Sequence, residues 1–205
     1  RQSPVLKPYS SAGEVKFNRG AAVSFQKKRW EASFFGSVKN ISGTMATDAF
    51  GEKVFTSIQT SGLHTTQSEI STKNNIQQTS FGSNLAYVHQ KFTIGLNAVQ
   101  YQFSKPFQKR NEPYNLFAWS GRAWRNASID YSITHKNIHL FGEAALDKNL
   151  NKAFINGAMI SVDPKVDISL LHRHISKEYA AVYGNAFTEN ILPSNENGLY
   201  AGISI

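Results

Sequence analysis

The stretch that decides the fold is residues 127–133, which read ASIDYSI and alternate strictly between apolar and polar side chains. Successive side chains of a β-strand point to opposite faces, whereas a helix repeats about every 3.6 residues. The pattern therefore predicts a strand with Ile129 and Tyr131 on one face and Ser128 and Asp130 on the other.

The same alternation recurs along most of the chain and predicts nine strands, near residues 20–27, 30–40, 78–90, 92–103, 122–134, 138–147, 152–162, 166–174 and 198–205. Several of these match the roughly 9–11 residues of a tilted membrane-crossing β-strand. The connections alternate in length. Short turns are expected at 27–29, 89–91, 135–137 and 163–165, and longer links at 41–77, 104–121, 148–151 and 175–197. Short turns at one end and long loops at the other are typical of outer-membrane barrels.

Composition excludes several other classes of protein. The 205 residues are 40% hydrophobic and 12% aromatic, which is incompatible with a disordered chain. Cysteine is absent, so disulfides and thiolate chemistry are excluded, and no run of 18 apolar residues indicates a transmembrane helix. The net charge is +8, but the basic residues are scattered and Lys27-Lys28-Arg29 is their only cluster. We interpret this excess as solubilising or as a polar turn.

These patterns predict an all-β fold, an antiparallel transmembrane β-barrel with about nine strands in this chain as part of a larger barrel. The apolar face would contact outer-membrane lipid, and the polar face would line a lumen. Aromatic girdles at the membrane boundary would include Phe25, Trp30, Phe92 and Tyr131. The residues predicted to face the lumen are Glu31, Asp130, Glu143, Asp167 and Arg173.

A soluble β-sandwich or a lipocalin-like barrel is the structural rival, because it also alternates but turns its apolar face inward. Sandwich strands are usually 5–6 residues long, which favours the membrane barrel. The rival predicts that Trp30, Phe34, Ile129 and Leu140 gather in a dry interior.

The odd strand count is itself informative, since bacterial single-chain barrels have even numbers of strands. Residues 1–205 are therefore expected to form one barrel segment of a longer polypeptide, with residues 1–20 as an extracellular lead-in. The alternative is one miscounted strand in a complete barrel of eight or ten. The links 41–77, 104–121 and 175–197 are expected to be extracellular loops.

No pattern predicts catalytic, cofactor-binding or metal-binding residues. His172 and His174 share a strand face, but a metal site needs a third ligand. His64, in a polar loop with Ser68 and Glu69, has the residue types of a hydrolase site without evidence of proximity. The long loops are rich in aromatic residues, which favours partner contact, although the loops could instead pack on each other. The partner-contact candidates are Phe55, Phe107, Tyr114, Tyr183 and Phe187.

Several short motifs resemble the β-barrel region of Bacteroidota outer-membrane proteins of the helix-hairpin-helix (ComEA-like) family. They lie at residues 62–70 (GLHTTQSEI), 81–85 (FGSNL), 103–106 (FSKP), 113–115 (PYN), 141–144 (FGEA) and 183–187 (YGNAF), with Lys73 and Gln77 between the first two. The resemblance covers most of residues 20–205. It implies an outer-membrane barrel with further sequence on both sides, and it implies no substrate. The helix-hairpin-helix segment is not in this chain, so nucleic-acid binding is not expected.

The sequence thus predicts a non-enzymatic protein of the outer membrane of a Gram-negative bacterium, serving as a structural or accessory subunit of a larger envelope complex. Its partners would be outer-membrane lipid and other envelope proteins. One alternative is a channel or transporter barrel for small polar solutes. A less favoured alternative is a barrel enzyme that hydrolyses lipid esters.

Overall fold

The computed structural model describes residues 5–7, 17–60, 62, 65–184, 186–189 and 193–205. Of these residues, 63% are in strands and 4% in helices, and the sheet is mostly antiparallel. This confirms the all-β part of the predicted fold class. The chain divides into two compact units. Unit 1 comprises residues 1–23, 34–82 and 100–124, and unit 2 comprises residues 24–33, 83–99 and 125–205.

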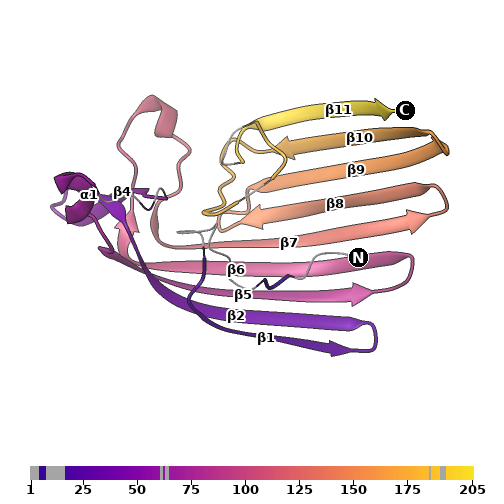
Figure 1. Ribbon diagram of the computed structural model, residues 1–205. Helices are drawn as coiled ribbons and strands as arrows, with labels where there is room; N and C mark the ends of the chain where they lie inside the picture. The colour runs from indigo at the N-terminus through magenta and orange to yellow at the C-terminus, as the bar shows by residue number, and fades with distance from the viewer. Residues whose placement is uncertain (1–4, 8–16, 61, 63–64, 185, 190–192) are drawn as a thin grey trace. The chain divides into compact units, whose positions relative to one another are not determined.

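Nine strands follow one another as neighbours in the order β1-β2-β5-β6-β7-β8-β9-β10-β11 (Figure 1). Each corresponds to a predicted strand, and most bounds agree within two residues. Their bounds are β1 Gly20–Lys27, β2 Trp30–Ile41, β5 Ile76–Val88, β6 Phe92–Phe107, β7 Gly121–His135, β8 Ile138–Asp147, β9 Lys152–Asp163, β10 Val166–Ile175 and β11 Glu196–Ser204. The local alternation was therefore sufficient to locate these strands.

The sheet is open, because β1 and β11 are its two edges. Closure into a barrel is thus not seen in this structure. An edge strand presents unpaired backbone N–H and C=O groups along its free side. The antiparallel, all-β part of the prediction is confirmed, and the closed transmembrane barrel stays a prediction.

Unit 2 contains the four short turns that were expected from the sequence. They join β1 to β2, β5 to β6, β7 to β8, and β9 to β10. Lys28 and Lys136 adopt positive φ angles of 57° and 53° in two of these turns. From β7 to β10 the pairing is regular apart from one register shift, between Val166 and Asp167. Regular pairing keeps the alternation of side chains in phase from strand to strand.

Unit 1 contains elements that the sequence reading missed, since the link 41–77 is not an extended loop. It holds the hairpin of β3 (Gly43–Thr47) and β4 (Lys53–Ile58), followed by the short helix α1 (Gln67–Ser71). Strand β4 also pairs in parallel with β6 at Phe55 and Phe107. The link from β6 to β7 starts later than expected, because β6 extends to Phe107, and it holds the 3-10 helix η1 (Pro113–Asn115).

An aromatic cluster forms the core of unit 1. Phe55 is fully buried, with its ring centroid 5.4 Å from that of Phe103 and 5.1 Å from that of Phe107. Trp119 stacks on Phe107 at 4.2 Å and contacts Trp124 at 5.3 Å. Because aromatic pairs add about 0.5–1.5 kcal/mol beyond the area they bury, this cluster fixes the β3–β4 hairpin against β6.

One face of the sheet exposes large apolar side chains, whereas the opposite face buries apolar residues such as Ile41 and Ile76 together with polar ones. Trp30, Phe34, Ile129 and Leu140 are each 40 to 53% exposed, so these four do not form a dry interior. On the other face of β2 and β5, polar side chains are buried, among them Ser37, Lys39, Gln78 and Ser80. The arrangement expected of a soluble sandwich is therefore not found for these residues. Among the described residues, no helix is both long and apolar enough to cross a bilayer.

Candidate functional site

The polar face of unit 2 carries four of the five residues predicted to face a lumen. Asp130 on β7 lies directly opposite Glu143 on β8. Glu143 lies opposite Ile155 on β9, which in turn lies opposite Arg173 on β10. Asp167 shares the face of Arg173 by alternation and accepts a hydrogen bond of 2.6 Å from the Ser161 hydroxyl. These four residues therefore share one face, and whether that face lines a lumen stays a prediction.

Glu31, the fifth, lies on the same face at the β1–β2 hairpin. Its carboxylate accepts a hydrogen bond of 3.0 Å from the Gln26 amide. Its neighbour Trp30 points to the opposite face, where it contacts the Tyr87 ring with centroids 5.0 Å apart. Since Tyr87 and Asn84 are an odd number of residues apart on β5, Asn84 lies on the side of Glu31.

A chain of amide and carboxylate groups crosses this polar face from β5 to β7. The Asn84 amide donates to the Asn97 side-chain oxygen at 2.7 Å. The Asn97 amide donates in turn to Asp130 at 2.7 Å and to the Ser128 hydroxyl at 3.2 Å. A Cβ on Gly95 would lie 2.4 Å from the Asp130 carboxylate, so a larger residue there would require this carboxylate to move. The polar groups satisfy one another, which makes their partial burial tolerable.

Asp147, at the end of β8, connects two loops of unit 2. One carboxylate oxygen accepts N–H groups from Asn149 at 2.9 Å and Asn151 at 3.0 Å. The other accepts the Asn151 amide at 3.1 Å and the backbone N–H of Ala180 at 3.2 Å. Asp147 is buried, and four donors compensate its charge. It thereby fixes both the 148–151 turn and the start of the β10–β11 loop.

Tyr179 packs beside this carboxylate. Its hydroxyl accepts a hydrogen bond of 3.4 Å from the Asn126 amide, which also donates to the Ala180 carbonyl at 2.8 Å. Burial raises the pKa of Tyr179, and the negative charges of Glu143 and Asp147 raise it further. Its phenol is therefore neutral and unsuited to act as a base.

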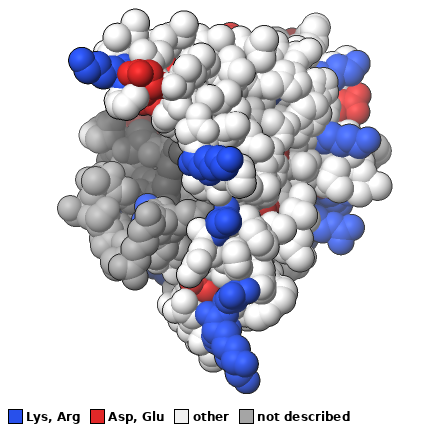
Figure 2. All heavy atoms as spheres, turned by 90° about the vertical axis from the view of Figure 1, so that its right-hand side faces the viewer, with Lys and Arg blue, Asp and Glu red and all other residues white. Residues whose placement is uncertain are grey.

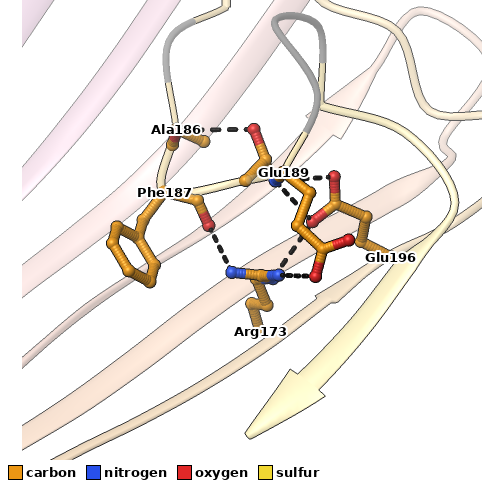
Figure 3. Close-up of polar contacts among 6 residues, drawn as sticks. Arg173, Ala186, Phe187, Glu189 and Glu196 are labelled. Carbon is orange, nitrogen blue, oxygen red and sulfur yellow. Dashed lines mark hydrogen bonds and ion pairs between the residues drawn. The ribbon is translucent and has the colours of Figure 1, made fainter. Parts of the chain in front are cut away.

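Arg173 forms the second anchor of the β10–β11 loop (Figure 3). Its guanidinium donates to the Phe187 carbonyl at 3.2 Å and to Glu189 at 3.0 Å. Its Nε lies 3.1 Å from Oε2 of Glu196, as an ion pair whose N–H is not aimed at the carboxylate. The backbone N–H of Glu189 also donates to Glu196 at 3.2 Å. The side chains of Arg173 and Glu196 are only 14% and 8% exposed, so this pair is largely desolvated.

The five partner-contact candidates differ sharply in their surroundings. Phe55 and Phe107 are buried in the aromatic cluster, because β4 pairs with β6, so they are core residues and offer no contact surface. Tyr114 and Phe187 are exposed, and Tyr183 is half-buried. Of these five candidates, only Tyr114 and Phe187 present large exposed rings for a partner.

The two described histidine candidates, His172 and His174, do not lie in a catalytic or metal-binding arrangement. His172 and His174 both contact the Phe154 ring, with centroids 5.6 and 5.1 Å apart. The residues that the structure describes include no group of three or more His, Cys, Asp or Glu side chains able to hold a metal ion. His64 lies outside the described residues, so the hydrolase hypothesis is not tested there.

One group of residues was missed by the sequence reading, which treated the basic residues as scattered. Figure 2 looks onto the end of the strands that carries the short turns, and Lys and Arg side chains stand out along it. Every short turn of unit 2 carries at least one of them, from Lys27, Lys28, Arg29, Lys91, Lys136 and Lys165. We call these six the basic turn row. Its signal in the sequence was the Lys27-Lys28-Arg29 cluster at the first predicted short turn and a single lysine at each of the other three.

The polar face, the two loop anchors and the basic turn row contain no arrangement of groups that defines a reaction. Comparison with protein-family models, with curated proteins and with solved structures finds no match to this chain, so the resemblance to Bacteroidota barrel proteins stays a prediction from short motifs.

Proposed function

We propose that this chain forms part of the wall of an outer-membrane β-barrel and serves as a non-enzymatic structural or accessory subunit of an envelope complex. The observation that carries the proposal is the set of large apolar side chains that the sheet exposes on one face. Large apolar side chains such as Trp30, Phe34 and Ile129 are exposed on one face, while Gln78 and Ser80 are fully buried on the other.

The physical argument concerns solvent. A soluble protein rarely exposes a contiguous apolar patch of more than a few hundred Å². Exposing this apolar surface to water costs free energy, whereas exposing it to lipid acyl chains does not. A closed sheet would also satisfy the backbone hydrogen-bonding groups inside the bilayer. The open edges β1 and β11 would then pair with further strands, in keeping with the even strand numbers of bacterial barrels. The subunit role is supported by Tyr114 and Phe187, whose rings are exposed on loops.

Two arginine substitutions on β7 test the membrane position. Ile129→Arg places a charge on the exposed apolar face, and the matched control Ser132→Arg places it on the polar face. An arginine facing lipid near the bilayer midplane costs about 2–4 kcal/mol. We therefore expect Ile129→Arg to lower the folding yield into phosphatidylcholine vesicles at least tenfold, and Ser132→Arg to leave it nearly unchanged.

A soluble protein would behave differently, because an exposed arginine at position 129 would be tolerated or would improve solubility. Equal folding of both variants, or stable folding without detergent or vesicles, would contradict the membrane position. The subunit role is tested by native electrophoresis after extraction in mild detergent. The double variant Tyr114→Ala, Phe187→Ala should lose a companion protein that the wild type retains, and a wild type that always migrates alone would rule that role out.

A channel is the second candidate, favoured by the polar face that runs across β5, β6 and β7. However, Asn84, Asn97 and Asp130 are hydrogen-bonded to one another, which leaves fewer groups free to replace the hydration shell of a solute. Single-channel recording in planar bilayers separates the two functions. Steady conductance that changes with Asp130→Asn would favour the channel, and its absence would favour the structural subunit.

A further inference from the structure

The basic turn row lies along one end of the strands of unit 2, although its residues are far apart in the sequence. Backbone hydrogen bonds tie each short turn to the next hairpin. The N–H of Val88 donates to the Arg29 carbonyl at 2.7 Å, and the N–H of Thr134 donates to the Lys91 carbonyl at 2.7 Å. The N–H of Ser161 donates to the Asn137 carbonyl at 2.9 Å. With neighbouring strands about 4.8 Å apart, successive turns lie about 10 Å apart.

The row has almost no acidic compensation. The four turns, residues 27–29, 89–91, 135–137 and 163–165, contain six Lys or Arg and one acid, Asp163. All six basic side chains are exposed. The ion pairs found in the part of the chain that the structure describes use Arg122 and Arg173, and none uses a member of the row. The row is therefore a mainly positive surface, with Asp163 as the single acidic residue within its turns.

Aromatic side chains lie beside this row on the exposed apolar face. Arg29 donates a hydrogen bond of 3.2 Å to the Tyr87 hydroxyl. The Tyr87 ring contacts Trp30 at 5.0 Å and Phe92 at 5.9 Å between centroids. Amphipathic rings such as those of Trp and Tyr are enriched at the level of lipid headgroups. The row thus lies where an apolar surface ends, next to rings of the kind that mark such a boundary.

We propose that the basic turn row binds the phosphate groups of anionic phospholipids at the membrane surface on the short-turn side. This inference rests on the proposed membrane position. We choose phospholipid phosphates as the ligand because of charge complementarity. If the apolar face contacts lipid, the lysine and arginine side chains at its end lie at the level of the headgroups. Each such residue strengthens attraction to an anionic surface by roughly fivefold at low salt.

The experiment compares two fourfold variants that change the net charge equally. Lys28→Gln, Lys91→Gln, Lys136→Gln and Lys165→Gln remove one lysine from each turn. The matched control replaces Lys53, Lys73, Lys109 and Lys152 with glutamine in the same way. These four lysines are exposed and lie outside the short turns. The proteins are held in uncharged detergent with equal amounts of phosphatidylglycerol and phosphatidylcholine. Native mass spectrometry then counts the lipids retained.

The wild type and the control should retain phosphatidylglycerol in preference to phosphatidylcholine, and 0.5 M NaCl should weaken that preference. Because each of the four removed lysines contributes up to about fivefold, the turn variant should retain at least tenfold less phosphatidylglycerol or lose it entirely. Equal retention by the turn variant and the control overturns this inference, as does a wild type that shows no preference while inserting normally into vesicles. Failure of the wild type to insert at all overturns the proposed function, and this inference with it.

Discussion

The two units hold their loops in different ways. In unit 1 the β3–β4 hairpin is fixed by aromatic packing, with Phe55 fully buried against Phe103 and Phe107. In unit 2 the β10–β11 loop is fixed by charged groups, Asp147 at its start and Arg173 at its end. Apolar packing is insensitive to salt and pH, whereas hydrogen-bonded ions respond to both. The difference implies that the two loops respond differently to the same conditions.

The largest expected effect is the loss of the aromatic anchor. Phe55→Ala removes a fully buried ring and should lower the free energy of unfolding by about 3–5 kcal/mol. Urea unfolding in detergent micelles measures this change in the free energy of unfolding. Phe50→Ala is the matched control, because Phe50 lies in the link between β3 and β4 but is 96% exposed, and it should change the stability by less than about 0.5 kcal/mol. A comparable loss in both variants would contradict the packing argument.

The next effect concerns the ionic anchor. Arg173→Met leaves the Glu196 carboxylate desolvated without its cation, which should cost about 2–3 kcal/mol after allowance for partial exposure. Hydrogen exchange at the Glu189 amide, which donates to Glu196, should accelerate. Arg122→Met is the control, since its ion pair with Glu52 is exposed and should be worth less than about 1 kcal/mol.

A double variant separates the lost ion pair from the lost side-chain packing. Adding Glu196→Gln to Arg173→Met removes the uncompensated charge and should recover part of the stability. If Arg173→Met alone leaves the exchange of the Glu189 amide unchanged, the β10–β11 loop is held by other contacts.

The smallest effect is a pH dependence of helix α1 in unit 1. Glu69 accepts N–H groups from Thr65 at 2.9 Å and Thr66 at 3.0 Å, while its own N–H donates to the Thr66 hydroxyl at 3.2 Å. The Thr66 and Thr65 backbone donors lower the pKa of Glu69 from 4.5 to about 2. Because the folded pKa is depressed, the stabilisation is present above pH 4.5 and is lost as the pH falls through about 2.

Amide chemical shifts of Thr65 and Thr66 should report this fraying between pH 4.5 and 2. Glu69→Gln keeps a capping side chain without an ionisable proton, so it should abolish the titration while retaining part of the cap. An unchanged titration of these amides in the Gln variant would assign it to another group.

The sequence predicted correctly those features that depend on residues adjacent in the chain. The ASIDYSI stretch and its counterparts located nine strands, and the basic residues of the row already lay at the expected turns. The β3–β4 hairpin was missed because its strands are short and its pairing shifts register between Thr44 and Met45. Phe55 was taken for a contact residue because its burial depends on Phe103 and Phe107, about 50 residues away in the chain.

By itself, the sequence determined which segments are strands and which side chains share a face, because the two-residue period of a strand is a property of local backbone geometry. Only the tertiary structure decided that the apolar face is exposed, that the sheet is open between β1 and β11, and that Arg173 pairs with Glu196. It also brought basic residues from four separate turns to one end of the strands of unit 2. These features depend on contacts between residues distant in the chain, and no local pattern encodes which distant residues meet.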